Sequence, residues 1–162
     1  MPIFTPDKAL RDLPKTPVIL SIILKDVTQQ QAQTARDGAD GWTVLEVMCH
    51  LNDYEQVFVE RTHQIVESDY PHIENIDHLA WVSDHRYAEQ QLADVFARYL
   101  STRRAHLAFL RGLTPDQWQR KALSMLWGEI TLVEHVTNIT FHDVNHTEQI
   151  IKALGTSQIP AL

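Results

Sequence analysis

Two histidines one helical turn apart, His142 and His146, are the residues of this chain best placed to do chemistry. On a helix, residues at this spacing have Cβ atoms roughly 5–6 Å apart on one face, so both imidazoles can reach a single cation. The chain contains nine histidines, so a pair at this spacing can also arise by chance and be merely solvated or hydrogen-bonded. A metal site therefore requires a third ligand from another element. Three histidines would suit zinc, nickel or iron.

Two other residues of the same segment bear on such a site. His135 precedes His142 by two helical turns, about 10 Å along the helix axis at 1.5 Å per residue, which is too far to share one ion. Asp143 falls near the middle of the apolar stripe, about 20° from Leu132 at 100° per residue, where an acid is out of place. It orients a ligand imidazole, or acts as a base, or is exposed by a small rotation of the helix. The sequence leaves these alternatives open.

The segment that carries the pair, residues 131–154, has a complete set of helix signals. Thr131 and Glu134 form a capping box, and Gly155 provides a left-handed stop after the last apolar residue. The apolar stripe consists of Leu132, Val136, Ile139, Ile150 and Leu154, and a second stripe along its edge consists of His135, His142, His146 and Gln149. We expect one long helix here, with the histidines at the margin of its buried face.

A third histidine, His50, lies at the edge of the apolar stripe of a second well-defined helix. Thr43 and Glu46 form a capping box at the start of this helix, which is expected to end near Ser68. Two helices in contact at roughly 8–10 Å can bring the ring of His50 to the histidine pair. Cys49 is adjacent to His50 but points about 100° away around the helix, so it is expected in the core.

The rest of the chain is also read as helical. Apolar spacing predicts a first long helix over about 17–27 and a third over 91–113, which ends at a glycine. Residues 69–87 contain a proline and no long period, which predicts a crossover connection with a single turn of helix. No strand is expected, and residues 123–130 are interpreted as a turn. The fold class is therefore all-α, a four-helix bundle with one long crossover connection.

Length and composition limit the classes of protein. A chain of 162 residues with 44% hydrophobic residues is expected to form a single domain, 1–162, and four prolines in residues 1–17 predict an irregular N-terminal arm over 1–15. The net charge of −7 and the absence of a basic run argue against a nucleic-acid partner. The one cysteine excludes an internal disulfide. No signal peptide or apolar run of membrane-spanning length is present, so the expectation is a cytoplasmic protein with no membrane partner.

Two short motifs resemble those of a known family. They are W-T-V-L-E-V-M-C-H at 42–50, with its tryptophan-threonine entry and terminal histidine, and H-D-V-N-H-T-E-Q at 142–149, with a glutamine after the second histidine. Both occur in the order and at about the distance found in the DinB-like (YfiT-like) superfamily of metal-binding four-helix bundles. The resemblance covers roughly residues 16–154.

The resemblance implies a divalent metal, zinc or nickel, held by His50, His142 and His146, with open positions filled by water. Three neutral imidazoles leave the charge of such a metal uncompensated, so it can lower the pKa of a bound water or thiol. A structural zinc site would have four protein ligands instead. The expected site is therefore catalytic.

The better understood members of the family use low-molecular-weight thiols, so the resemblance implies a thiol-dependent transferase acting on a small-molecule substrate. A metal-dependent hydrolase and a non-catalytic stress-response bundle are the alternatives. The chain ends soon after its fourth helix, and we expect it to lack the additional C-terminal domain of some thiol-dependent isomerases, which argues against isomerase activity. A homodimer is expected, formed through the apolar surface of the first and third helices.

Overall fold

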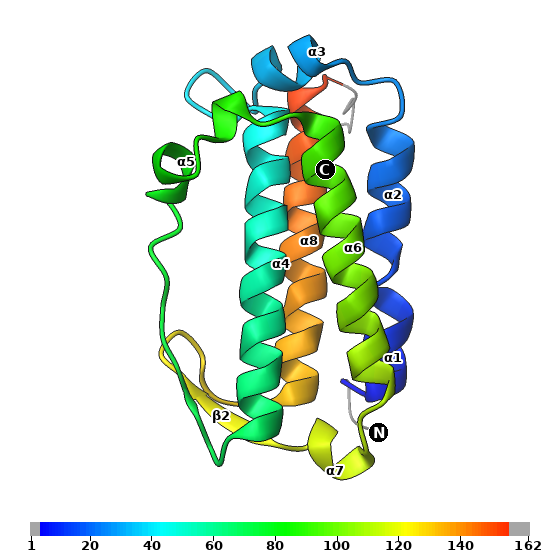
Figure 1. The fold of residues 1–162 in the computed structure, drawn as a ribbon, viewed down its shortest axis with the longest axis vertical. Helices are drawn as coiled ribbons and strands as arrows, with labels where there is room; N and C mark the ends of the chain where they lie inside the picture. Colours follow the sequence, from blue (N-terminus) through cyan, green and yellow to red (C-terminus); the bar gives the residue numbers. More distant parts are fainter. Residues whose placement is uncertain (1–3, 156–162) are drawn as a thin grey trace, which may run out of the picture.

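Helices aligned along one axis form most of the molecule, as the computed structural model shows for residues 4–155 (Figure 1). Three of them are long: α4 (Val44–Glu67), α6 (Leu92–Arg111) and α8 (Leu132–Ala153). The fourth position is filled by two consecutive helices, α1 (Pro6–Asp12) and α2 (Lys15–Ile23). The four-helix bundle expected from the sequence is confirmed.

The N-terminal segment differs from the expected irregular arm over 1–15. Residues 1–3 lie outside the described part, but α1 begins at Pro6, and the Thr5 hydroxyl accepts a hydrogen bond from the backbone N–H of Lys8. Pro14 is the N-cap of α2. A proline at a helix start costs nothing, because the N–H that it lacks would have no intrahelical acceptor there. The prolines therefore mark where two helices begin, and the prediction of an irregular arm is wrong.

The ends of the helices that carry the three histidines follow the sequence signals. At the start of α4 the Thr43 hydroxyl accepts from the backbone N–H of Glu46, and the Glu46 carboxylate accepts from the backbone N–H of Thr43. Thr131 and Glu134 make the same reciprocal pair at the start of α8. The residue after the C-cap of α8, Gly155, has a φ of +66°. Both helices are thus fixed in register by their own sequence.

Short helices occupy the connections. They are α3 (Gln29–Thr34) before α4, α5 (Trp81–Asp84) and the 3-10 helix η1 (Tyr87–Glu89) between α4 and α6, and α7 (Pro115–Trp118) after α6. The crossover from α4 to α6 runs back along the bundle, so these two helices point the same way, while α2 and α8 point the opposite way (Figure 1). The expected long crossover with one turn of helix is confirmed.

A small sheet at one end of the bundle was not expected. Strand β1 (His72–Ile73) pairs in parallel with β2 (Lys121–Ser124), and β2 pairs antiparallel with β3 (Gly128–Thr131). The predicted turn over 123–130 is instead most of a hairpin, closed by Gly128 with a φ of +73°. Strands of two to four residues are too short to show an alternating pattern, so no strand was predicted. The hairpin holds its tip beside α4 and α8.

The interior of the bundle consists of two apolar clusters with a charged layer between them. On α4 one cluster ends at Leu51 and the other begins at Phe58, and Glu55 lies between them. Arg103 of α6, which is 1% exposed, donates to Glu55, to Asp143 of α8 and to the carbonyl of Leu13 at the end of α1. One guanidinium therefore binds a group from each of the other three helical positions. No helix within residues 4–155 has the length and apolar content needed to cross a membrane.

Candidate metal centre

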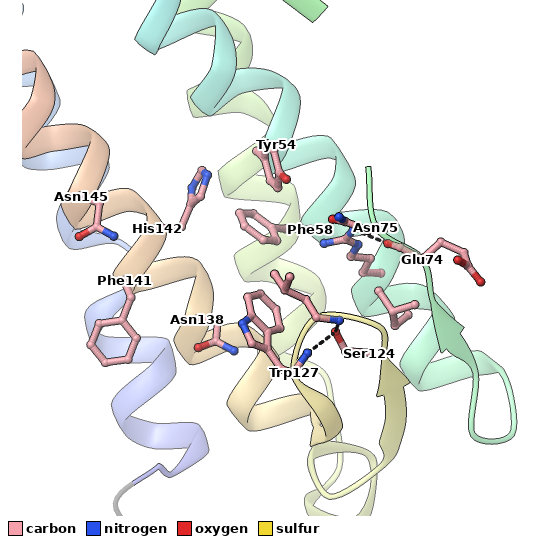
Figure 2. Close-up of a pocket in the computed structure, with 13 residues that line it drawn as sticks. Tyr54, Phe58, Glu74, Asn75, Ser124, Trp127, Asn138, Phe141, His142 and Asn145 are labelled. Atoms are coloured by element: carbon pink, nitrogen blue, oxygen red, sulfur yellow. Dashed lines mark hydrogen bonds between the residues drawn. The ribbon is translucent and has the colours of Figure 1, made fainter. Parts of the chain in front are cut away.

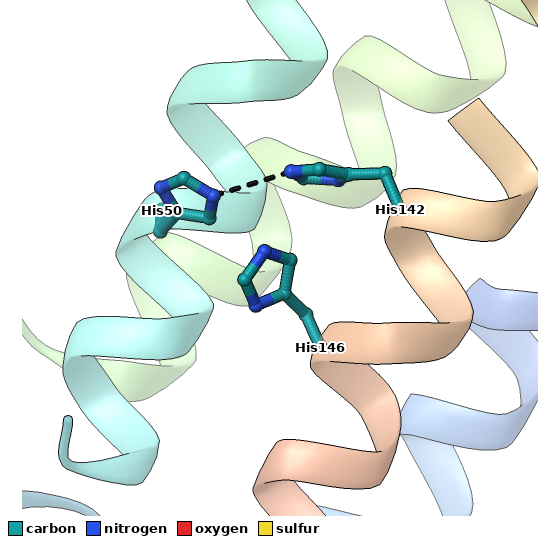
Figure 3. Close-up of side chains that lie close together, drawn as sticks. All are labelled: His50, His142 and His146. Atoms are coloured by element: carbon teal, nitrogen blue, oxygen red, sulfur yellow. Dashed lines mark hydrogen bonds between the residues drawn. The ribbon is translucent and has the colours of Figure 1, made fainter. Parts of the chain in front are cut away.

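His50 of α4 meets His142 and His146 of α8, as Figure 3 shows. One ring nitrogen of each histidine lies within 4.8 Å of the corresponding nitrogens of the other two. The Nε2 atoms of His50 and His142 are 3.2 Å apart. Two nitrogens bound to one zinc at tetrahedral angles, each 2.0–2.1 Å from the metal, would be about 3.3 Å apart. The three residues expected to act together are brought together, and the spacing of one pair fits a shared cation.

The protonation of these rings suits metal binding. Burial first, and the neighbouring histidines second, lower the pKa of His50 to about 2. Burial likewise lowers the pKa of His146 to about 4. Both rings are therefore neutral near pH 7, and neutral imidazole is the form that ligates metals. The set of donors fits a divalent cation that prefers nitrogen ligands.

Hydrogen bonds hold the three rings unequally. The Nδ1–H of His146 donates to the side-chain oxygen of Gln149, 2.9 Å away, which leaves Nε2 of that ring with its lone pair. In contrast, Nδ1 of His50 and Nδ1 of His142 are buried without a hydrogen-bond partner among the described residues. Metal-ligating histidines usually donate their second N–H to a protein group or water. Only His146 has such a protein partner here.

Aromatic side chains surround the three histidines. The indole of Trp42, just before the cap of α4, lies 5.0 Å from the His50 ring between centroids, and the Tyr54 ring lies 4.8 Å from it on the same helix. The crossover contributes His78, whose ring centroid is 5.2 Å from that of His50 and whose Nδ1 is 3.4 Å from the Tyr54 hydroxyl. His78 could not be assigned to the site from its spacing, because only the path of the crossover brings it to α4.

A cavity of about 290 Å³ adjoins the histidine cluster (Figure 2). Its lining comes from Tyr54, Phe58 and Arg61 on α4, from Asn138, Phe141, His142 and Asn145 on α8, from Ser124, Leu126 and Trp127 in the hairpin, and from Ile73, Glu74 and Asn75 in the crossover. His142 belongs both to the cavity wall and to the histidine cluster. A molecule in the cavity would therefore touch one of the candidate ligands.

Asp143, the acid singled out in the sequence, faces the charged layer and not the cavity. It is 1% exposed, so the alternative of a rotated helix with an exposed Asp143 is wrong. Burial alone would raise the pKa of Asp143, but the charge and hydrogen bonds of Arg103, together with the adjacent His142, outweigh burial and lower it. The carboxylate also interacts electrostatically with the adjacent His142, although Nδ1 of that ring makes no hydrogen bond of ordinary geometry.

His135, His106 and Cys49 lie apart from the cluster. His135 is buried, with Nε2 3.3 Å from the carbonyl oxygen of Phe58, and is not part of the histidine cluster, in agreement with its two-turn displacement from His142. His106 is buried in the charged layer, 3.0 Å from a carboxylate oxygen of Glu55. Cys49 is in the core as expected, and burial raises the pKa of its thiol to about 12. That thiol is inert at neutral pH.

Comparisons with known proteins agree with the fold. The family model of the DinB superfamily matches residues 13–150. The structure is similar to YfiT from Bacillus subtilis, described as a probable metal-dependent hydrolase with an unusual four-helix bundle topology, with 24% identity, a TM-score of 0.84, and coverage of 93% of this chain and 86% of YfiT. It is also similar to a mycothiol-dependent maleylpyruvate isomerase, with 12% identity, a TM-score of 0.72, and coverage of 90% of this chain.

This chain spans 60% of the length of that isomerase. A search of curated proteins gave no match. The sequence identities to both solved structures are below 25%, so these two similarities show a shared fold only. The family model, in contrast, matches most of the amino-acid sequence. The chain therefore belongs to the DinB superfamily.

Proposed function

We propose that this protein binds one divalent metal, zinc or nickel, through His50, His142 and His146 and uses it to hydrolyse a small molecule held in the adjacent cavity. The observation that carries this proposal is that the three imidazoles lie close together beside the cavity and that one of them, His142, lines its wall. When bound, such a metal acts as a Lewis acid that activates water or a thiol and polarises a substrate oxygen. Three protein ligands leave room for this role.

The residues around the site would orient the ligands and limit access of water. Gln149 accepts from Nδ1–H of His146 and so presents Nε2 of that ring to the metal. Trp42 and Tyr54 cover His50 on two sides and keep the site apolar. Asp143 would act as a positioning residue, because its carboxylate is bound to Arg103 and lines no part of the cavity.

The size of the cavity favours hydrolysis over thiol transfer. Ligand pockets usually hold 300–1,000 Å³, roughly, and this cavity of about 290 Å³ is at the lower limit. It suits one small substrate with water better than a substrate together with a thiol cofactor. The similarity over most of YfiT, described as a probable metal-dependent hydrolase, favours the same choice. Thiol-dependent transfer, the function first expected, is the second candidate because the fold is shared with a mycothiol-dependent isomerase.

Metal analysis and two activity screens test this function. Protein purified without a histidine tag should contain about one zinc or nickel per chain and should hydrolyse some members of an ester and amide panel in thiol-free buffer. Chelation should abolish turnover, and zinc or nickel should restore it. Turnover only in the presence of a small thiol would replace hydrolysis by thiol transfer. Metal binding without turnover in either screen would leave a non-catalytic metal-binding bundle.

The assembly proposed is a homodimer through a surface that keeps the first expected helix, α2, but replaces the third, α6, by α8. Among the described bundle helices, the exposed large apolar side chains lie on α2 (Val18, Ile19 and Ile22) and on α8 (Phe141 and Val144), with none on α6. Helices α2 and α8 pack against each other, and apolar surface that is exposed on neighbouring elements often marks an interface. Light scattering at micromolar concentration should give twice the mass of 18.7 kDa. Ile22→Asp should give the monomer, and a monomeric wild type would exclude the dimer.

A further inference from the structure

Arg61 differs from the buried Arg103 in that no carboxylate pairs with it among the described residues. Arg103 is bound by two carboxylates, Glu55 and Asp143. Arg61 is half-buried in the cavity wall and has no carboxylate within 4 Å among the described residues. Burial lowers the pKa of Arg61, yet a guanidinium stays protonated at any ordinary pH. The cavity therefore contains a positive charge that no described side chain neutralises by a direct ion pair.

The guanidinium is held in place while keeping free donors. One terminal nitrogen of Arg61 donates to the backbone carbonyl of Glu74 in the crossover, 2.8 Å away. An arginine has five N–H donors, so this bond fixes the group and leaves several available. Glu74 also lines the cavity, but its carboxylate extends away from the other labelled residues (Figure 2). The nearest acid of the lining thus does not neutralise the guanidinium.

The rest of the lining suits the recognition of an anion with an apolar body. Three amide side chains, Asn75, Asn138 and Asn145, line the same cavity, and none makes a side-chain hydrogen bond to another described residue. Amide N–H groups can add to the donors of an arginine around a carboxylate or phosphate. Aromatic rings complete the wall, among them Phe58 and Trp127.

The arrangement along the helices gives the orientation of such a ligand. His50, Tyr54, Phe58 and Arg61 follow one another at spacings of four, four and three residues, so they lie along one face of α4. On the antiparallel α8, His142 and Asn138 are related in the same way. Arg61 is eleven residues from His50, about 16 Å along α4 at 1.5 Å per residue, with the cavity between. The anionic end of a ligand at Arg61 would be remote from the histidines.

We infer that Arg61 is the specificity residue of the cavity and that the substrate is a small organic anion, a carboxylate or phosphate monoester with an aromatic or aliphatic body, whose reacting bond faces His142. This inference rests on the proposed function for the identity of the reacting end. The binding of the anion itself does not require the metal.

Calorimetric titration of the metal-free protein with three probes tests the inference: benzoate, the uncharged benzamide of the same size, and phenyl phosphate. Charge-assisted hydrogen bonds to an arginine should make benzoate or phenyl phosphate bind about 10- to 100-fold more tightly than benzamide. Arg61→Gln should remove this preference and leave benzamide binding unchanged. Arg61→Lys should recover part of it, because a lysine keeps the charge but loses the planar fork. The exposed Arg104→Gln, which makes the same change of charge on α6, should have no effect.

The tighter of the two anions identifies the ligand class. Equal binding of benzamide and both anions to the wild type, or an anion preference that survives in Arg61→Gln, would overturn the inference. Metal content of the wild type and of Arg61→Gln is measured in parallel. An anion preference that depends on Arg61 in a protein that takes up no metal would refute the proposed function alone. One metal per chain without an anion preference would refute the inference alone.

Discussion

At the scale of single residues, His50, His142 and His146 are candidate metal ligands because their ring nitrogens lie close together. His135, on the same helix as two of them, is a matched control. His142→Ala should reduce the metal content of the purified protein sharply, because it removes one of three nitrogens that lie within 4.8 Å of one another. His135→Gln should retain the metal, since His135 bonds to the Phe58 carbonyl instead. Inductively coupled plasma mass spectrometry gives the stoichiometry of both. Full occupancy in His142→Ala, or equal loss in both variants, would rule the assignment out.

Gln149 provides a second test at this scale, through a residue that does not contact the metal. Its side-chain oxygen accepts from Nδ1–H of His146 and fixes the tautomer of that ring. Gln149→Ala should weaken metal affinity by about 10- to 100-fold, the usual cost of losing such a partner. Competition with a chromophoric chelator measures the affinity. Gln149→Glu, which retains an acceptor oxygen, should preserve it. Unchanged affinity in Gln149→Ala would show that the ring needs no support.

His135 also makes the stability of the protein depend on pH. Burial lowers its pKa to about 4, despite the hydrogen bond to Phe58, whereas an unfolded histidine has a pKa of about 6.5. Between about pH 6.5 and 4 His135 is therefore protonated in the unfolded state but neutral in the folded state. The free energy of unfolding falls as the pH falls through this range. At 1.36 kcal/mol per pKa unit the loss is about 3 kcal/mol. Urea unfolding at several pH values should show a shallower fall for His135→Gln than for wild type. Parallel curves would contradict this.

Among the elements, the sequence predicted the helices that carry the histidines better than the connections between them. Capping boxes and apolar periods are local signals, and they placed the starts of α4 and α8 at the observed residues. Strand β1 depends on pairing with β2, about fifty residues away, which no local pattern reveals. Strands β2 and β3 form a local hairpin but are too short to show a strand period. Helix α1 was missed because the prolines of this segment were interpreted as helix breakers, whereas α2 overlaps the first helix predicted over about 17–27.

In the candidate site, too, some residues could be predicted from local sequence patterns and others could not. The pair His142 and His146 follows from helical spacing, and His50 follows from its place at a helix edge together with the resemblance. His78 and the hairpin residue Trp127 reach the site only through the crossover and the sheet, which were not predictable from spacing. Arg61 did have a signal, because it continues the face of α4 that begins at His50. A helical arginine is usually solvated, so this position alone did not identify Arg61 as a cavity residue.

Across the whole molecule, the charged layer around Arg103 connects all four helical positions. Asp143 is in this layer and is adjacent in sequence to His142. In the sequence, the only sign of this layer was Asp143 near the middle of an apolar stripe. A buried arginine could not be inferred from one chain segment, because its carboxylate partners come from two other helices.

Replacing this arginine should test how far the layer supports the fold. Arg103→Met would leave Glu55 and Asp143 buried without their cation, and removing one partner from a buried ionic group costs about 3–5 kcal/mol. Urea unfolding should show a loss of this size in the free energy of unfolding. Adding Glu55→Gln and Asp143→Asn to Arg103→Met should recover part of the loss, since neutral amides are less costly to bury than unpaired charges. If Arg103→Met is as stable as the wild type, or if the triple variant is less stable than Arg103→Met, the layer does not stabilise the bundle through charge.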